Sequence, residues 1–223
     1  MLLAVMTVHF AMAQRAGDII NAPAYKDTEK YFTVSTLSDS VLNRMRGRSL
    51  PAGKEAWARE TLRHLWVLHV GTDGKTHVGE LVCNKAIASN LRSIFLSLYR
   101  EGYRIESIRL VDEYGGNDDL SMQHNNTSCF NYRLVEGTNH LSNHGRGLAI
   151  DLNPLYNPWV HSGKVSPVEG RPYAFNRQKV KAPVPIIGTW DSAYRLFRKH
   201  GFTWGGAWRS SKDYQHFEKK IEK

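Results

Sequence analysis

The sequence is poor in the features that mark several common classes of protein. Cys83 and Cys129 are its only cysteines, and neither belongs to a C-x-x-C pair, so a thiolate zinc site is not indicated. The two either form a disulfide in an oxidising compartment or are buried free thiols, and we favour free thiols. There is no internal repeat and no low-complexity segment, and 8 Pro and 18 Gly are ordinary numbers for 223 residues, so disorder is not expected.

Concentrated charge is also absent. Lys and Arg number 30 against 21 Asp and Glu, a net charge of +9, but no block of five or more like charges occurs. A basic surface attracts polyanions, yet a solvated surface that only aids solubility explains this charge equally well. Because no basic element or nucleic-acid-binding motif is visible, we expect no nucleic-acid partner.

Long apolar runs are missing apart from the first residues, which end in Ala11-Met12-Ala13. This stretch is too short to span a bilayer as a helix, and no basic segment precedes it. It resembles the apolar region and A-x-A cleavage site of a signal peptide, with an N-terminal strand or disordered segment as the alternative. We therefore expect a signal peptide over 1–13, an irregular extension over 14–36, and export across the inner membrane to the periplasm or cell envelope without stable membrane insertion.

Residues 37–223 are predicted to form one monomeric α+β domain, with a small, mainly antiparallel sheet flanked by helices. Helices are expected over residues 39–45, 85–101 and 191–200. Strands are expected over 62–71 and 76–83, joined by a hairpin at Asp73-Gly74, and over 105–111, 130–135, 148–152 and 214–217. Residues 153–184 hold five of the eight prolines and predict a long surface excursion of the kind that often flanks a binding cleft.

The segment from Ser142 to Asp151 is the most informative one. His144 offers an imidazole nitrogen and Asp151 a carboxylate, and both are good zinc ligands. Two glycines between them permit a tight turn before a short apolar strand, so both side chains can face one cleft. Either residue alone is unremarkable, because the chain has ten histidines.

The segment from Trp204 to Glu218 supplies the missing third ligand, His216. Asp213 lies three residues earlier, where a carboxylate is able to accept a proton from an attacking water. Three loop histidines compete as ligands: His124, His140 and His161. Trp204 and Trp208 are interpreted as core aromatics that support the site.

The combined pattern S-x-H-x-x-G-x-A-x-D, W-G-G-x-W and D-x-x-H-F resembles the zinc D-alanyl-D-alanine carboxypeptidase and L-alanyl-D-glutamate peptidase family. The matching residues are Ser142, His144, Gly147, Ala149, Asp151, Trp204, Gly205, Gly206, Trp208, Asp213, His216 and Phe217. Judged by motif order, the resemblance covers roughly residues 31–218. It implies the fold shared with the hedgehog signalling domain, one Zn²⁺ per chain on His144, Asp151 and His216, and Asp213 as general base.

Two further roles rest on this resemblance. Many relatives carry Glu where this chain has Asp213, so the shorter side chain requires closer backbone placement. Relatives also use an upstream arginine for the scissile carbonyl or a substrate carboxylate, and Arg133 is the candidate, with a surface arginine as the alternative. Ser142 either hydrogen-bonds substrate or orients the loop of His144.

The expected function is therefore zinc-dependent hydrolysis of a peptide bond in peptidoglycan stem peptides, of the D-alanyl-D-alanine carboxypeptidase type. An L-alanyl-D-glutamate endopeptidase and a non-hydrolytic zinc-binding recognition module are the alternatives. Asp213 beside the last ligand favours an enzyme over the recognition module. Which bond is cut depends on the walls of the cleft, which we place within residues 157–181.

Overall fold

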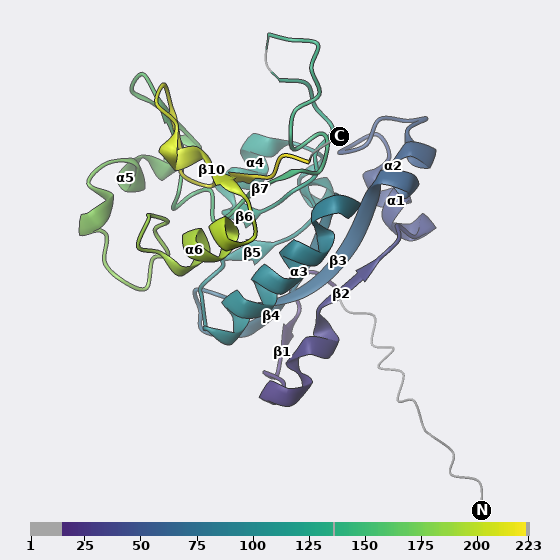
Figure 1. Cartoon of the computed structure of the whole chain (residues 1–223), viewed down its shortest axis with the longest axis horizontal. Helices are drawn as coiled ribbons and strands as arrows, with labels where there is room; N and C mark the ends of the chain where they lie inside the picture. Colours follow the sequence, from purple (N-terminus) through teal and green to yellow (C-terminus); the bar gives the residue numbers. More distant parts are fainter. Residues whose placement is uncertain (1–14, 136, 222–223) are drawn as a thin grey trace, which may run out of the picture.

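The structure is a computed structural model that describes residues 15–135 and 137–221. The expected signal peptide over 1–13 lies outside the described residues. The described chain is a mixed α+β fold with small, mostly antiparallel sheets, as predicted (Figure 1). No helix among the described residues has the length and apolar character needed to cross a membrane.

The largest sheet is built on a long hairpin. Its strands, in spatial order, are β1 (Ile19–Ile20), β4 (Thr76–Asn84), β3 (Leu62–Val70) and β2 (Thr33–Ser35), and all neighbours are antiparallel. The β3–β4 hairpin around Asp73-Gly74 confirms the prediction. The segment expected to be irregular, residues 14–36, instead contributes β1, the 3-10 helix η1 (Tyr25–Tyr31) and β2. These strands are too short for periodicity to reveal, and they form because both edges of the hairpin offer unpaired backbone groups.

Three further sheets are smaller. One is β10 (Thr203–Trp204), β12 (His216–Glu218) and β7 (Ala149–Asp151); a second is β11 (Lys212–Asp213), β8 (Trp159–His161) and β9 (Lys164–Ser166). The third pairs β5 (Ser107–Ile108) in parallel with β6 (Asn126–Thr127). Thus the excursion over 153–184 contains a hairpin, β8–β9, that the lack of periodicity did not reveal.

The helices agree with the sequence pattern where that pattern was strong. They are α1 (Asp39–Met45), α2 (Glu55–Thr61), α3 (Lys85–Arg100), α4 (Asp118–Gln123), α5 (Arg171–Ala174) and α6 (Ser192–Lys199). The remaining 3-10 turns are η2 (Val111–Tyr114), η3 (Val168–Gly170), η4 (Arg177–Lys179) and η5 (Gly205–Ala207). Side chains of Ser38, Asn84 and Asp191 cap α1, α3 and α6, so three of the predicted helix starts are confirmed.

Two of the strands predicted from the sequence are not found as predicted. The strand predicted over 130–135 is wrong, because its backbone is shared between two partners: Asn131 N–H donates to the His144 carbonyl and Tyr132 N–H to the Ser49 carbonyl. A segment divided in this way cannot form one ladder. The strand predicted over 105–111 shrinks to β5, since the chain turns into η2 at Val111.

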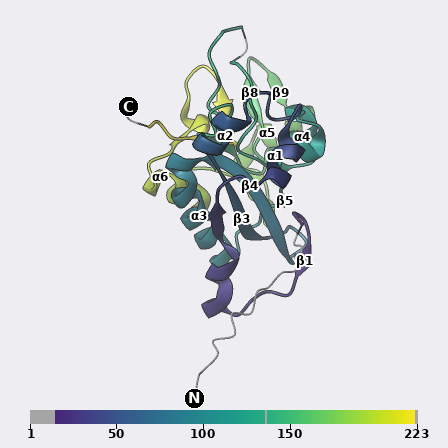
Figure 2. The same cartoon turned by 90° about the vertical axis from the view of Figure 1, so that its right-hand side faces the viewer.

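One hydrophobic core joins the hairpin sheet to the sheet that contains β7 and β12. It includes Leu81 of β4, Ile94 and Phe95 of α3, Ile150 of β7 and Phe217 of β12. In Figure 2, α3 and α6 lie together on one flank of the hairpin, and the two helices are in contact. Cys83 and Cys129 are buried free thiols, as favoured above, and burial raises the pKa of both.

His69 makes the stability of the fold depend on pH. Its side chain on β3 is buried, Nδ1–H donates to the Ile105 carbonyl at 2.7 Å, and burial lowers its pKa to about 4. The unfolded chain, with a histidine pKa near 6.5, then binds more protons than the native chain between about pH 6.5 and 4.

We therefore expect the free energy of unfolding to fall as the pH drops through this window, with up to about 3 kcal/mol arising from His69. Urea unfolding at several pH values, compared with His69→Asn, measures this contribution. The exposed His140→Asn is the control. If the wild type and His69→Asn keep the same difference in stability at pH 4.5 and 7, His69 does not carry the effect.

Candidate metal centre

Register pairing of two strands brings two of the predicted ligands together. In the antiparallel pair β7–β12, Asp151 lies directly opposite His216, and Ile150 lies opposite Phe217. Opposite residues point to the same face, with Cβ atoms about 4.5–5.5 Å apart. A slip of one residue would send His216 to the buried side and Phe217 into solvent, so the core position of Phe217 enforces the alignment.

A tight turn delivers the third ligand, His144. Arg146 N–H donates to the Ser142 carbonyl and Gly147 N–H to the His144 carbonyl, while Ser142 Oγ accepts from Gly145 N–H at 2.9 Å. Gly147 has a φ of +67°, and a Cβ there would lie 2.7 Å from the backbone nitrogen of Asn84. The turn therefore requires glycine at this position. Ser142 orients the loop, one of the two roles expected for it.

The three donor groups converge on a common point. His144 Nε2 lies 3.2 Å from His216 Nδ1 and 3.3 Å from Asp151 Oδ2, and His216 Nδ1 lies 3.2 Å from Asp151 Oδ1. Ligand atoms placed tetrahedrally about 2.0–2.1 Å from a zinc ion are separated by about 3.3–3.4 Å. The donor set and its spacing fit a metal ion, and these three residues can hold one.

Outer hydrogen bonds fix which imidazole nitrogen faces the centre. His144 Nδ1 lies 2.8 Å from the Cys129 carbonyl oxygen, so that nitrogen carries the proton and Nε2 presents its lone pair. His216 Nε2 lies 3.0 Å from the Glu218 carboxylate, which likewise leaves Nδ1 free. Glu218 is held in turn by the Asn143 amide, which donates to it at 2.7 Å. Such partners set the tautomer and raise the basicity of a metal-binding histidine.

The electrostatics of the cluster demand a positive charge. Burial opposes ionisation of Asp151, but the adjacent imidazoles of His144 and His216 outweigh it and lower the pKa of its carboxyl. Burial likewise opposes charging of His216, yet hydrogen bonds to Asp151 and Glu218 raise its pKa. A cation at this point, whether a proton or a metal ion, satisfies the carboxylates that surround it.

Asp213 stands beside the cluster on β11. Among the described residues, its Oδ1 is a buried oxygen without a hydrogen-bond partner, and burial raises the pKa of the carboxyl to about 6. Gly205 makes room for it, because a Cβ on Gly205 would lie 2.7 Å from the Asp213 carbonyl oxygen. A carboxylate with one buried, unpaired oxygen next to a metal-ligand set is a strong candidate for proton transfer.

These groups face a cleft of about 440 Å³. Its wall includes Trp159 and Ser166 from the β8–β9 hairpin, so the excursion does flank the cleft. The ring of Trp208 lies 5.3 Å from that of His216 and also lines the cleft, whereas Trp204 is buried in the core.

Arg133 also lines the cleft. Its Nε pairs with the carboxylate of Asp118, which also accepts from the Asn131 amide at 2.7 Å. Among the described residues it is the one arginine or lysine on the cleft wall. The three competing histidines, His124, His140 and His161, lie outside the ligand cluster.

Sequence reasoning missed Glu218 and Asn143 as supporting residues. Each had a signal: Glu218 lies two positions after His216 on a strand, hence on the same face, and Asn143 directly precedes His144. Trp159 and Asp118 had no such signal, since they reach the cleft only through tertiary packing.

Comparison with known families assigns this part of the chain. A family model described as D-alanyl-D-alanine carboxypeptidase matches residues 136–219. Residues 136–219 are thus similar to this carboxypeptidase family. The matched segment contains His144, Asp151, Asp213 and His216, which include the three residues that can hold a metal ion. No curated protein and no solved structure was found to match the chain.

Glu218 provides a test of the metal centre. Glu218→Ala removes the acceptor for His216 Nε2–H and frees the ring to rotate or change tautomer, so we expect divalent-cation affinity to fall about 10–100-fold. Glu218→Gln keeps an acceptor oxygen and should restore most of that affinity. Competition with a chromogenic chelator measures it, and Glu101→Ala, an exposed site, is the matched control. Equal affinities for wild type and Glu218→Ala would refute this role of Glu218.

Proposed function

We propose that the protein is a zinc-dependent peptidase that hydrolyses peptidoglycan stem peptides, of the D-alanyl-D-alanine carboxypeptidase type. One observation carries the proposal: three donor groups whose nearest atoms lie 3.2–3.3 Å apart, with Asp213 and its unpaired, buried Oδ1 lining the same cleft. The family match over residues 136–219 supports the same reaction.

The donor set favours zinc with one ion per chain. Two imidazoles and one carboxylate are ligands of catalytic zinc sites, in which three protein ligands leave one position open. A zinc ion held there supplies a Lewis acid that polarises an amide carbonyl and makes water a better nucleophile near neutral pH. An ion held by His144, Asp151 and His216 would be accessible from the cleft, because all three residues line it.

Residues of the chain carry out proton transfer, ligand orientation and substrate binding. Asp213 accepts a proton from the attacking water and delivers it to the departing amine, a transfer that contributes about 10²–10⁴-fold in rate. Glu218 and Asn143 hold the His216 ring in the orientation that binds the metal. Trp159 and Trp208 give the cleft apolar walls for the methyl groups of alanine residues.

Arg133 favours a carboxypeptidase over an endopeptidase. A carboxypeptidase must recognise a free terminal carboxylate, and Arg133 is the cation on the described cleft wall that is placed to bind one. Its Nε is engaged by Asp118, which orients the guanidinium and leaves the two Nη groups for substrate. This function places the protein in the cell envelope, where the apolar leader over 1–13 would direct it, as a monomer without membrane insertion.

Asp213→Asn tests the proton transfer. The amide has the same shape but cannot accept the proton, so we expect kcat to fall about 10²–10⁴-fold while zinc content stays at one ion per chain. Asp119→Asn, exposed on α4 and outside the cleft, is the matched control. Wild-type hydrolysis of muropeptides by Asp213→Asn would exclude Asp213 as the base.

The bond that is cut can be identified with zinc-loaded protein and defined muropeptides analysed by mass spectrometry. We expect loss of a terminal D-alanine from pentapeptides, and Arg133→Gln should raise KM for them more than it lowers kcat, since it binds the carboxylate. Release between L-alanine and D-glutamate would assign the endopeptidase instead. Zinc binding without any hydrolysis would favour the recognition module.

A further inference from the structure

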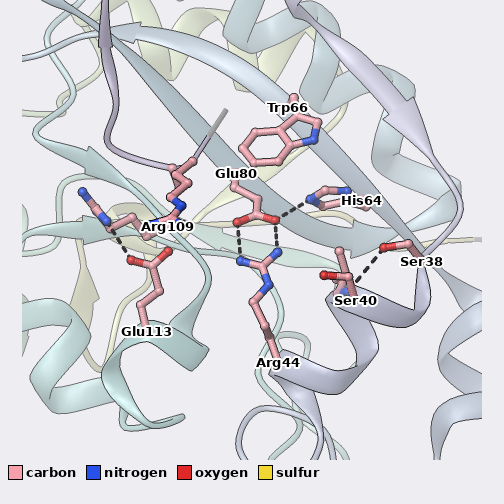
Figure 3. Close-up of a pocket in the computed structure, with 11 residues that line it drawn as sticks. Ser38, Ser40, Arg44, His64, Trp66, Glu80, Arg109 and Glu113 are labelled. Atoms are coloured by element: carbon pink, nitrogen blue, oxygen red, sulfur yellow. Dashed lines mark hydrogen bonds and ion pairs between the residues drawn. The ribbon is translucent and has the colours of Figure 1, made fainter. Parts of the chain in front are cut away.

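A second, larger cavity lies away from the metal centre. It has a volume of about 710 Å³, within the range of about 300–1,000 Å³ typical of small-molecule sites. Its lining residues come from the N-terminal part of the chain: Arg15, Ala16, Ser38, Ser40, Val41, Arg44, His64, Trp66, Glu80, Arg109 and Glu113 (Figure 3). All of them precede the segment that matches the carboxypeptidase family model, and none of them lines the cleft of the metal centre.

The hairpin sheet supplies one wall of this cavity. Trp66 of β3 pairs with Glu80 of β4, and His64 lies two residues before Trp66, so the three side chains share one face of the sheet. The His64 ring packs edge-on against the Trp66 indole with centroids 5.2 Å apart, which fixes the indole. Arg44 and the two serines approach from α1 and its N-cap, as Figure 3 shows.

A buried charge network holds this wall in place. The Glu80 side chain is 0% exposed; one carboxylate oxygen accepts from Arg44 Nη1 at 2.9 Å, and the other lies 2.6 Å from His64 Nε2. Burial alone would raise the pKa of Glu80, but the hydrogen bonds with His64 and Arg44 outweigh it and lower the pKa. Buried ion pairs are often no more stabilising than apolar side chains of the same volume. The position of this charge network at the wall of a cavity therefore points to a role in presenting Arg44 to a ligand.

Both carboxylates on the cavity wall are paired with arginines, and Arg15 is a third arginine that lines the cavity. Arg44 pairs with Glu80, and Arg109 Nη1 donates to Glu113 at 2.7 Å. Two of the three arginines are thus largely neutralised in place, so the cavity attracts a strong anion less than three unpaired guanidinium groups would. The cavity offers guanidinium donors, a partly exposed carboxylate acceptor in Glu113, and serine hydroxyls that both donate and accept hydrogen bonds.

This combination fits a ligand rich in hydroxyl groups. Each hydroxyl group both donates and accepts hydrogen bonds. It can therefore donate to a carboxylate and accept from the guanidinium paired with it, whereas an ion can do only one of the two. The partly exposed indole of Trp66 adds a flat apolar platform for the C–H face of a sugar ring. We propose that this cavity is a saccharide-binding site that takes uncharged, N-acetylated sugar rings.

The choice of saccharide rests on the proposed function, because the glycan strand of peptidoglycan carries the stem peptides. A glycan contact in this cavity would tether the enzyme to the polymer and raise the effective concentration of peptide at the metal centre. Binding of sugar is nevertheless independent of hydrolysis, so the two proposals can fail separately.

The test uses calorimetric titration of the purified full chain with two uncharged probes, chitotetraose and chitohexaose. We expect saturable binding that is weakened at least about tenfold in Trp66→Ala. Ser40→Glu places a longer side chain at the rim, where it can pair with Arg44 and fill the cavity. Because acidic residues are favourable in the first turn of a helix, this variant should fold and yet bind the sugar weakly.

Two controls separate this site from others. Trp190→Ala removes an exposed tryptophan outside the cavity and should leave binding unchanged. Asp213→Asn should bind sugar like the wild type although it is hydrolytically impaired. Wild-type protein that binds neither probe at millimolar concentration, or Trp66→Ala and Ser40→Glu variants that bind as the wild type does, would overturn the proposal. Displacement of bound sugar by millimolar inorganic phosphate would also overturn it, in favour of an anion site.

Discussion

The alignment of β7 with β12 is the constraint on which the metal centre depends. It sets Asp151 opposite His216 on the cleft face and Ile150 opposite Phe217 on the core face. Burial of Phe217 and Ile150 in the core therefore stabilises the arrangement of the ligands, because the hydrophobic face and the ligand face belong to the same strands. Because the core enforces this register, the chain presents two of the ligands as a consequence of folding.

The third ligand is added by a different kind of structure. His144 belongs to a turn whose hydrogen bonds involve Ser142 and Gly147, and which contacts the backbone of Asn84 at the beginning of α3. Helix α3, the β3–β4 hairpin and the sheet of β7, β10 and β12 are thus connected at the point where the His144 imidazole enters the cleft. Preorganisation of this kind reduces the reorganisation that metal binding and catalysis would otherwise require.

The two halves of the chain present contrasting polar sites. Around the metal centre, the carboxylates of Asp151, Asp213 and Glu218 outnumber the cations, an arrangement that attracts a metal ion. In the N-terminal cavity, two of the three guanidiniums are paired with carboxylates, which suits a ligand without strong charge. The hairpin sheet, which lines the N-terminal cavity, and α3 share one hydrophobic core with the sheet of β7, β10 and β12, which carries two of the metal ligands. A catalytic centre and a polymer-binding site on one rigid body would allow the polymer to position its own scissile bond.

What the sequence by itself determined was local. Local sequence was enough to predict the helix over 85–101 from its 3.6-residue periodicity and the hairpin from its Asp73-Gly74 turn. The sequence also contains the candidate site residues in order: His144, Asp151, Asp213 and His216. The short strands β1, β2 and β11 and the irregular path of 130–135 depended on partners far along the chain, so tertiary structure decided them. The same holds for the 3.2–3.3 Å convergence of the donors and for the cavity beneath Trp66, because both arise from side chains that meet only once the hydrophobic core has fixed the register of the strands.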